Sequence, residues 1–399
     1  MFACSAQESG NRGVVELSKP LLFTPFAMRG VTAPNRAVVS PMVQYRATDG
    51  LVNDYHIVHL GKFALGKFGI VFTENCAVEP RGRVTQGDLG MWDDGQMEGH
   101  KRLTRFLHQE GSLAATQITH AGRKASSPRQ FDKPDEFGPK DGGWQRWQVV
   151  GPSALSAGER YSESPLALEV PEMDAIVRKF GEAARRADAA GYDIVEIHGA
   201  HGYLLAQFLS PLSNKRNDDY GGDRAGRMKF PLAAAKAVRE NWPEHKPMFI
   251  RVSAVDGGGG WDVDDTVAYA HELKALGIDV IDTSSGGLTG LSTAAPIKRA
   301  LGFQVPFAAA VKRGADMPTM AVGLILDGPQ AEKVLQDGDA DLIAIGRQAL
   351  YDPFWPVHAA QELGCDDDFG MWNPEYGWWL DKRKNNLPAD RAATGQAIK

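Results

Sequence analysis

The chain has 399 residues, with 44 Lys and Arg against 50 Asp and Glu, and 43% of its residues are hydrophobic. This composition permits a sizeable core and gives no basic surface for nucleic acid. No apolar run in the sequence approaches the length of a membrane span, which is about 18 residues, and its start shows no signal-peptide pattern. We therefore expect a cytoplasmic protein without a membrane partner. Cys4, Cys76 and Cys365 lie far apart, which argues against a disulfide framework, a zinc site or an iron–sulfur cluster.

Short β-branched runs alternate with longer amphipathic stretches along the chain. The runs are almost continuously apolar, as is typical of parallel strands that are buried on both faces. Strands are predicted at 38–42, 69–75, 113–120, 193–200, 248–254, 279–286, 319–325 and 342–346.

Helical patterns lie between these strands, at 173–191, 264–277 and 327–338 among others. Each of the three ends on a glycine, which favours a helix C-cap, and Asp327 can cap the last at its start. Strands that are each followed by a helix predict an α/β fold, the (β/α)8 TIM barrel. A dinucleotide-binding sheet is not supported, because no GxGxxG lies in a strand–helix turn.

Three segments fall outside this repeating pattern. Residues 21–39 predict a hairpin before the first barrel strand, placed as a lid on the barrel floor. The Gly-, Pro-, Ser- and Trp-rich stretch 126–171 is long enough to suggest a functional excursion on the top face. We expect a flexible N-terminus over 1–20, a barrel over 21–363 and an aromatic, basic tail over 364–399.

The most informative motif is IHGAHGYLLAQFLSPLSNKRNDDYGG, which follows the fourth predicted strand. Barrel enzymes carry their working residues at this end of the strands. His198 and His201 can both point into the barrel mouth and stabilise an enolate oxygen, and Tyr203 can deliver a proton. Metal ligation or a structural role is the alternative, with Glu74 and Glu196 as the nearby carboxylates; we favour catalysis and expect no metal site.

Further polar residues and glycines lie at the other strand ends. Gly323, Gly346 and Arg347 follow the last two strands, an arrangement that is typical of a barrel phosphate site. Arg251 lies within an apolar strand and needs a buried partner. That partner is either the anionic edge of a reduced flavin or a carboxylate of the protein.

In order and spacing, the motifs SPMVQY, ITHAGRK, the histidine motif, RVSA, DTSSGG, AVGLI and DLIAIGRQALYDPFW resemble the old yellow enzyme family of FMN-dependent ene-reductases. The match covers about residues 21–363 and looks most like the thermophilic-like and xenobiotic-reductase branch. The resemblance implies that NAD(P)H reduces FMN at N5 and that, after the oxidised nicotinamide leaves, a hydride passes to an activated alkene.

The resemblance also implies roles for individual residues. His198 and His201 would bind the substrate carbonyl, Tyr203 would donate the proton and Tyr45 would shape the pocket. The remaining positions would contact FMN, and they are Ser40, Pro41, Met42, Val43, Asn75, Gln117, Arg251, Ser285, Gly286, Gly323, Gly346 and Arg347.

Three departures from the branch affect these expectations. Val43 replaces a cysteine whose thiol contacts the flavin and tunes its potential. Asn75 stands where a small residue is common and could add a hydrogen bond to the ring. Trp378 lies nearest to the family's C-terminal arginine, which in some members reaches a neighbour's active site, and a tryptophan there would favour larger or aromatic substrates.

Three functions fit these residues to different degrees. The first is an ene-reductase for enones, enals, maleimides or nitroalkenes, with NADPH or NADH as reductant. The second is a family member that acts on an aromatic acyl-thioester or a nitrogen-containing xenobiotic, which Trp144 and Trp147 keep open. The third is a flavin-free phosphate-binding isomerase or aldolase. The aromatic tail favours a homodimer or homotetramer. We expect the substrate to be a small molecule.

Overall fold

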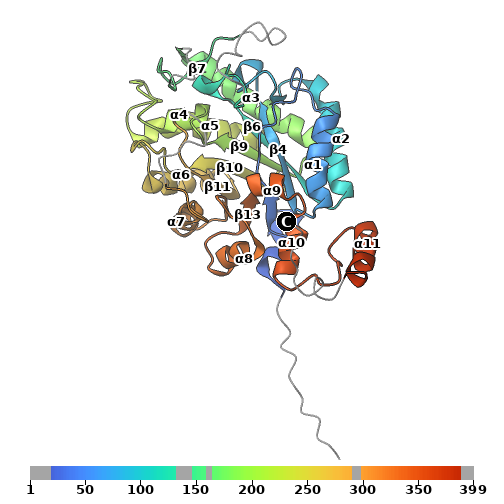
Figure 1. Ribbon diagram of the computed structural model, residues 1–399. Coiled ribbons are helices and arrows are strands. Elements are labelled where there is room, and N and C mark those ends of the chain that lie inside the picture. Colours follow the sequence, from blue (N-terminus) through green and yellow to red (C-terminus); the bar gives the residue numbers. More distant parts are fainter. Residues whose placement is uncertain (1–18, 132–145, 159–163, 290–297, 388–399) are drawn as a thin grey trace, which may run out of the picture.

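A computed structural model describes residues 19–131, 146–158, 164–289 and 298–387 (Figure 1). Parallel strands form a closed barrel, because β3 pairs with both β13 and β4 at the ends of the strand order. The barrel strands are β3 (Ala37–Val39), β4 (Ile70–Ala77), β6 (Leu113–Thr119), β9 (Ile194–Gly199), β10 (Met248–Ser253), β11 (Val280–Ser284), β12 (Thr319–Ala321) and β13 (Leu342–Ile345). The predicted (β/α)8 barrel is confirmed.

Two predicted strands were too long by three or more residues at their C-terminal ends. The strand predicted at 38–42 ends at Val39, because Pro41 has no N–H for the ladder and the chain turns away to reach a positive φ of 59° at Tyr45. The strand predicted at 319–325 ends at Ala321, because Gly323 has a φ of 124° that a strand cannot adopt. The residues that follow these two strands therefore form loops at the barrel mouth.

The helices surround the barrel (Figure 1). They are α1 (Asp54–Leu65), α2 (Met97–Gln109), α3 (Val170–Ala189), α4 (Leu204–Leu209), α5 (Arg224–Asn241), α6 (Val263–Ala275), α7 (Val305–Ala315), α8 (Gly328–Gln336), α9 (Arg347–Tyr351), α10 (Trp355–Glu362) and α11 (Pro374–Asn385). Short 3-10 turns are η1 (Leu21–Phe23), η2 (Pro80–Gly82), η3 (Asp94–Gln96) and η4 (Gly122–Lys124).

The predicted helix ends are confirmed by their cap geometry. Gly191, Gly277 and Gly338 have φ values of 87°, 86° and 72°, which glycine adopts without strain. The Asp327 side chain accepts a hydrogen bond of 2.8 Å from the Gln330 N–H at the start of α8. The helix predicted to start at 173 begins three residues earlier, at Val170, with Pro171 in its first turn.

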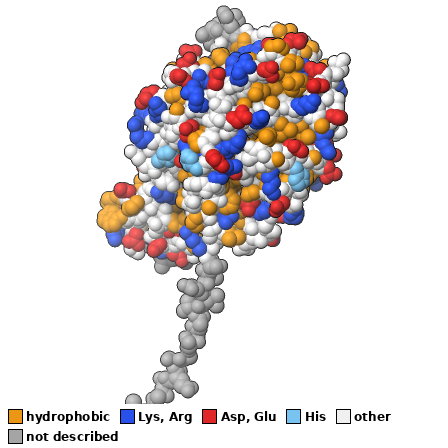
Figure 2. All heavy atoms as spheres, turned by 180° about the vertical axis from the view of Figure 1, so that it is seen from behind, with side chains coloured by type: hydrophobic (Ala, Val, Ile, Leu, Met, Phe, Trp, Pro, Cys, Tyr) orange, Lys and Arg blue, Asp and Glu red, His pale blue; other side chains and the backbone are white. Residues whose placement is uncertain are grey.

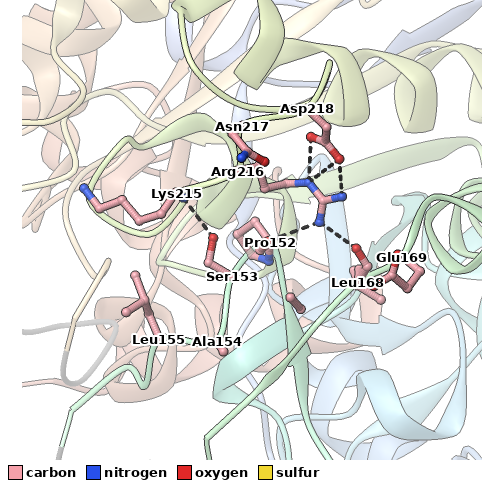
Figure 3. Close-up of a pocket in the computed structure, with 11 residues that line it drawn as sticks. Pro152, Ser153, Ala154, Leu155, Leu168, Glu169, Lys215, Arg216, Asn217 and Asp218 are labelled. Carbon is pink, nitrogen blue, oxygen red and sulfur yellow. Dashed lines mark hydrogen bonds and ion pairs between the residues drawn. The ribbon is translucent and has the colours of Figure 1, made fainter.

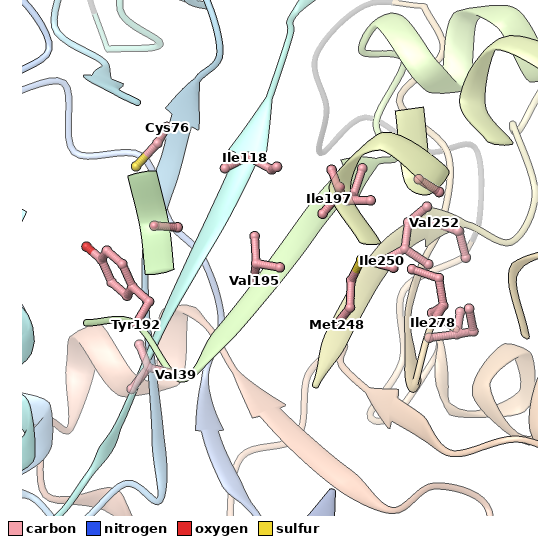
Figure 4. Close-up of a cluster of buried hydrophobic side chains, with 14 of the residues drawn as sticks. Val39, Cys76, Ile118, Tyr192, Val195, Ile197, Met248, Ile250, Val252 and Ile278 are labelled. Atoms are coloured by element: carbon pink, nitrogen blue, oxygen red, sulfur yellow. The ribbon is translucent and has the colours of Figure 1, made fainter. Parts of the chain in front are cut away.

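The strands bury both of their faces, as their apolar runs predicted. One set of side chains faces the helices and includes Val195, Ile197, Ile250 and Val252 (Figure 4). The alternate set, which includes Ile194 and Phe249, fills the lower part of the barrel lumen. The barrel is therefore a packed core below and becomes polar only toward the C-terminal ends of its strands.

The N-terminal hairpin closes the barrel floor. Strands β1 (Phe26–Met28) and β2 (Val31–Ala33) pair antiparallel, as predicted. Met28 and Ala33 are buried in the same cluster as the lumen side chains of the barrel strands. The hairpin is therefore part of the barrel core.

The excursion and the tail lie on different parts of the barrel. Within 126–171, β7 (Val150–Gly151) pairs with β8 (Leu166–Ala167), and β7 contacts α4 beside the histidine motif. Trp144 and most of the predicted flexible N-terminus lie outside the described residues. The tail helix α11 lies apart from the barrel strands (Figure 1). Within the described ranges, no helix has the length and apolar character needed to cross a membrane.

Candidate active site

The upper lumen is polar because alternate residues of the strands continue inward above the apolar layer. On β9, Ile194 is followed by Glu196 and then His198 on the same face. Arg251 of β10 lies beside His198 in register on one side and beside Asp282 of β11 on the other. The C-terminal ends of three neighbouring strands thus bring imidazole, guanidinium and carboxylate groups together at the barrel mouth.

The two predicted catalytic histidines lie side by side. His198 Nε2 and His201 Nδ1 are 3.2 Å apart, and the ring centroids are separated by 5.1 Å. His201 Nε2 lies 2.7 Å from Ser284 Oγ at the end of β11. The chain turns sharply here, with a φ of 57° at His201, and the His201 N–H donates to Ser253 Oγ at 2.9 Å. Neighbouring strands therefore hold His201 from both its backbone and its ring.

Both imidazoles are neutral near physiological pH. Burial, and after it the charge of Arg251, lowers the pKa of His198 to about 3. The same two causes lower the pKa of His201 well below its ordinary value. A neutral imidazole carries one N–H donor, so each ring can offer one hydrogen bond to a ligand. Among the described residues, no group of three or more His, Cys, Asp or Glu is placed to hold a metal ion.

The two predicted tyrosines approach the site from different elements. The Tyr203 ring centroid is 4.5 Å from that of His198, and Tyr203 is buried with Val84 and Ala121. Tyr45 lies on the loop after β3, and its ring meets Phe131 edge-on at 5.8 Å. Tyr203 is thus adjacent to the histidine pair.

Arg251 has the carboxylate partner that the sequence left as one of two alternatives. Its Nε lies 3.2 Å from Asp282 Oδ2, and its Nη1 donates to Ser40 Oγ at 3.0 Å. The ion pair does not saturate the cluster, because Arg251 Nε and both Asp282 oxygens make no hydrogen bond within the described structure. Glu196 accepts a hydrogen bond of 2.7 Å from Gln117 Nε2, while its Oε2 is also without a partner there.

Two buried carboxyl groups therefore share one cation in the upper lumen. Burial, and after it the charge of Asp282, raises the pKa of Glu196 well above its ordinary value. Burial likewise raises the pKa of Asp282 to about 6, although Arg251 opposes this effect. One proton on this pair near neutral pH leaves a net charge near zero, which a closed lumen requires.

The loop after β3 passes close to the end of β13. A side-chain carbon at Gly346 would lie 3.9 Å from both Met42 Sδ and Ser40 Cβ. The buried Glu74 anchors this loop by accepting the Gln44 N–H at 3.0 Å, and His56 Nε2 lies 3.3 Å from the other Glu74 oxygen. Pro41, Met42 and Val43 follow Ser40 on this half-buried segment.

Asn75 and Gln117 are neighbours in register on β4 and β6. Both side chains are buried, and Asn75 Nδ2 has no hydrogen-bond partner in the described part of the chain. A buried amide donor of this kind costs free energy unless a ligand satisfies it.

The predicted phosphate-binding residues lie at the ends of β12 and β13, which are adjacent strands. Gly323 is restricted to glycine, because a Cβ would meet the Gln304 side chain at 3.1 Å and its φ is positive. Gly346 precedes α9, whose first residue is the exposed Arg347. Open backbone and one guanidinium at this corner suit a phosphate.

Ser285 and Gly286 are largely engaged within the protein. Ser285 Oγ donates to Gln304 Oε1 at 2.7 Å, and the Gly286 N–H donates to the Val255 carbonyl at 2.7 Å. Their contribution to a cofactor site would therefore come mainly from the shape of this turn.

The predicted FMN fits the donors and acceptors present. Its carbonyl and ring-nitrogen edge needs hydrogen-bond partners of the kind that the unsatisfied Asn75 amide and Arg251 guanidinium offer. Its phosphate needs the glycine-rich corner at Gly323 and Gly346. These residues lie on different strands around one mouth, so they can contact the two ends of one elongated ligand.

A separate surface pocket of about 420 Å³ lies between β7–β8 and the loop 215–218 (Figure 3). Arg216 crosses it, pairing with Asp218 and donating to the Leu168 carbonyl at 2.6 Å and the Pro152 carbonyl at 3.2 Å. Because its guanidinium is used to tie these segments together, we place the active site at the barrel mouth instead.

Sequence reasoning missed several residues of the site. Asp282 lies inside a predicted strand, and Gln304 joins the strand-end residue Ser284 at the mouth. Lys124 of the ITHAGRK motif also belongs to the site, because its Nζ donates to the His201 carbonyl at 2.9 Å, and burial lowers its pKa to about 7. The charge of Asp282 within an apolar run was the one available signal.

Comparisons with known proteins agree with this geometry. Residues 21–366 match the NADH:flavin oxidoreductase / NADH oxidase family. The chain is 42% identical over 350 residues to an NADPH dehydrogenase of Bacillus licheniformis, covering 87% of this chain and 96% of that one. Morphinone reductase has a similar structure, with a TM-score of 0.71 and 27% identity over 88% of this chain and 91% of that one.

A 2-naphthoyl-CoA reductase solved with 2-naphthoyl-CoA is also similar, with a TM-score of 0.76 and 25% identity. The match covers 87% of this chain but only 53% of that longer chain.

Proposed function

The chain belongs to the NADH:flavin oxidoreductase / NADH oxidase family, and we propose that it reduces the C=C bond of activated alkenes. It is an FMN-dependent oxidoreductase with a nicotinamide reductant, as its NADPH dehydrogenase relatives indicate. The proposed substrates are enones, enals, maleimides and nitroalkenes, in which a carbonyl or nitro oxygen gains negative charge during hydride addition.

The observation that carries this proposal is the neutral histidine pair at the barrel mouth. An oxygen placed beside His198 Nε2 and His201 Nδ1 can accept an N–H from each ring when these two nitrogens carry the protons of their rings. Such donors stabilise charge that develops only as the hydride arrives, so they lower the barrier more than they tighten binding. Arg251, next to His198 in register, adds a positive charge to the same region.

Bound FMN supplies hydride chemistry, with the hydride received from NAD(P)H and given to the alkene in separate half-reactions. Asn75, Gln117, Arg251 and the loop 40–43 would hold its ring, and Gly323, Gly346 and Arg347 its phosphate. Tyr203, beside His198, holds the proton that the second alkene carbon requires. The buried, apolar wall at Val84 and Ala121 excludes water from this proton transfer.

The proposal is tested by anaerobic reduction of the purified yellow protein. NADPH or NADH should bleach the flavin absorbance, and cyclohex-2-enone or N-methylmaleimide should restore it with formation of the saturated product. A ping-pong mechanism predicts parallel lines in double-reciprocal plots when both substrates are varied. A protein that binds no FMN, or a reduced protein that no alkene reoxidises, would contradict the proposal.

An aromatic acyl-thioester is the second candidate substrate, favoured by the likeness to 2-naphthoyl-CoA reductase. Trp147 lies in the excursion 126–171 and offers an aromatic surface. Its position is fixed because its Nε1 donates to the Arg81 carbonyl at 2.9 Å. The same reoxidation assay with 2-naphthoyl-CoA separates the two candidates, because only one substrate class should reoxidise the flavin rapidly.

We also propose a homodimer or homotetramer. Helix α11 exposes Trp378 and Trp379 by 56% and 67%, and it protrudes with a compact group of hydrophobic side chains at the lower left of Figure 2. Glu375 of α11 acts electrostatically on Lys67, which precedes β4, so this helix lies by the barrel floor of its own chain. Trp378 therefore does not line the mouth of its own barrel, and we propose that it lines that of a neighbour. Trp378→Ala should change the preference for bulky alkenes, and sedimentation velocity should detect the oligomer.

A further inference from the structure

The histidine pair is joined by hydrogen bonds with a defined direction. The Ala200 N–H donates to His198 Nδ1 at 3.3 Å, and a backbone N–H can only donate. Neutral His198 therefore carries its proton on Nε2, which faces His201 Nδ1 at 3.2 Å. His201 Nδ1 accepts this hydrogen bond, so the proton of His201 lies on Nε2 and points to Ser284 Oγ at 2.7 Å.

This arrangement cannot give two hydrogen bonds to one substrate oxygen. An oxygen between the rings would meet the Nε2–H of His198 but the unprotonated Nδ1 of His201. Both donors become available only if His201 changes to its Nδ1–H tautomer. Its Nε2 then becomes an acceptor and needs a donor.

We infer that Ser284 is a positioning residue whose hydroxyl reverses its hydrogen bond and thereby switches the tautomer of His201 when a carbonyl substrate binds. The inference rests on the proposed function. A serine hydroxyl can accept from His201 Nε2 in the free protein and donate to it in the complex, with little movement of the oxygen. Lysine, arginine or a carboxylate at this position could serve only one of the two states.

The surroundings of Ser284 permit the reversal at little cost. In the free protein Ser284 Oγ–H has Gln304 Oε1 as a distant acceptor at 3.4 Å. Ser285 Oγ donates to the same Gln304 oxygen at 2.7 Å, so this acceptor stays satisfied when Ser284 turns away. Gln304 is itself fixed, because its Nε2 donates to the Val322 carbonyl at 3.2 Å.

The contacts of the His201 ring oppose the alternative, a rotation of the ring about its bond to Cβ. The backbone that carries the ring is also held in place, because its N–H is bound to Ser253 Oγ and its carbonyl accepts from Lys124 Nζ at 2.9 Å. A ring flip would break the contacts with His198 and Ser284 together, whereas a tautomer change keeps both positions. The proton exchange is balanced, since His201 gains a proton at Nδ1 and loses one at Nε2.

The test uses holoprotein labelled with 15N-histidine, whose ring-nitrogen shifts distinguish the two tautomers. In the free wild type, His198 and His201 should both carry Nε2–H. Cyclohex-2-enone added to the oxidised holoprotein without reductant should shift His201 to Nδ1–H. Assignment uses His201→Gln, which should remove one set of signals.

Variants of Ser284 separate its role from general packing. Ser284→Ala should raise the dissociation constant of cyclohex-2-enone about fivefold and reduce the population of the Nδ1–H tautomer. Ser284→Thr keeps the hydroxyl and should retain the switch. Thr283→Val, the matched control, removes a neighbouring hydroxyl on β11 that bonds the Met320 carbonyl but not His201 or Gln304, and should leave the tautomer response intact.

Different results overturn the two proposals. If the wild type reduces enones but His201 keeps its Nε2–H with ligand bound, the tautomer switch is wrong and the proposed function stands. The switch is also wrong if Ser284→Ala responds as the wild type does. If the wild type neither binds nor reduces an enone, the proposed function fails and the switch fails with it.

Discussion

Two buried groups of this barrel each pair carboxyl groups with cations, but they differ in how completely their polar atoms are hydrogen-bonded. In the first, the Glu79 network, Glu79 accepts from His120 Nε2 at 2.8 Å and pairs with Arg81 and Lys179. Burial alone would raise the pKa of Glu79, but His120 and the two cations lower it well below its usual range.

The second, the lumen cluster, comprises Gln117, Glu196, Arg251 and Asp282. Here two carboxyl groups share one guanidinium, and several of their polar atoms make no hydrogen bond within the described chain. Burial raises both carboxyl pKa values, opposite to the shift at Glu79.

The difference distinguishes a structural network from a binding site. A buried carboxylate whose partners are complete stabilises the fold, whereas a cluster with unmet donors and acceptors gains stability only when a ligand supplies them. The Glu79 network should therefore affect unfolding and the lumen cluster should affect FMN binding. The following variants test this comparison, from the largest expected effect to the smallest.

Glu79→Gln should lower the free energy of unfolding by about 3 kcal/mol, because it leaves two cations facing a neutral amide in a largely buried position. Urea denaturation of wild type and variant measures the loss. FMN content per folded protein should not change. Arg102→Ala, which breaks an exposed ion pair with Asp54, is the control and should cost less than about 0.5 kcal/mol. A loss below about 1 kcal/mol for Glu79→Gln would show that the Glu79 network does not stabilise the fold appreciably.

Arg251→Met should weaken FMN binding about 100-fold, corresponding to about 2.7 kcal/mol, because it removes the only cation among the residues of the lumen cluster. Fluorescence titration of apoprotein with FMN measures the dissociation constant. Arg251→Lys keeps the positive charge but lacks the planar guanidinium, so its dissociation constant for FMN should lie between those of the wild type and Arg251→Met. Unchanged affinity in Arg251→Met would show that FMN does not use this cluster.

The two groups should respond to pH in opposite directions. The pKa of Glu79 is lowered in the folded protein, so its contribution to stability is present above about pH 4.5 and is lost as the pH falls. The pKa of Asp282 is raised to about 6, so its contribution is present below about pH 3.8 and is lost as the pH rises through about 6.

Denaturation of apoprotein between pH 4 and pH 7 checks these signs. Asp282→Asn should remove a loss of about 1–2 kcal/mol across this range, and Glu79→Gln should not. Equal pH slopes in wild type and Asp282→Asn would contradict the shift at Asp282.

Asn75→Leu should have the smallest effect of these variants, and it should change FMN affinity without changing apoprotein stability. Replacing an unsatisfied buried amide by a side chain of similar volume should leave apoprotein stability unchanged within about 0.5 kcal/mol. FMN binding should weaken about fivefold, because one hydrogen bond to the ring is lost. A clear loss of stability without loss of FMN affinity would assign Asn75 to the packing of the barrel.

The barrel itself could be predicted from the sequence because its strands are buried on both faces. Runs such as 193–200 and 248–254 are largely apolar, and glycines such as Gly191 mark where helices end. The short strands β5 (Leu89–Gly90), β7 and β8 could not be predicted, since strands of two residues carry no periodicity.

The candidate site was predicted in its residues but only partly in its pairings. That His198 and His201 would be near each other followed from their spacing at a strand end. That Asp282 pairs with Arg251 depends on the register between β10 and β11, which a single sequence does not specify. The Glu79 network joins β4, α3 and the turn after β6 across about 100 residues of sequence, and no local pattern signals it.

The hairpin β1–β2 closes one end of the barrel, so that the lumen opens only at the other end. Met28 and Ala33 pack below Phe249 and the other lumen side chains. Solvent can reach Glu196 and Asp282 only from above, where a flat cofactor would seal the mouth. The acid pair should therefore exchange its proton with solvent more slowly in the holoenzyme than in the apoprotein.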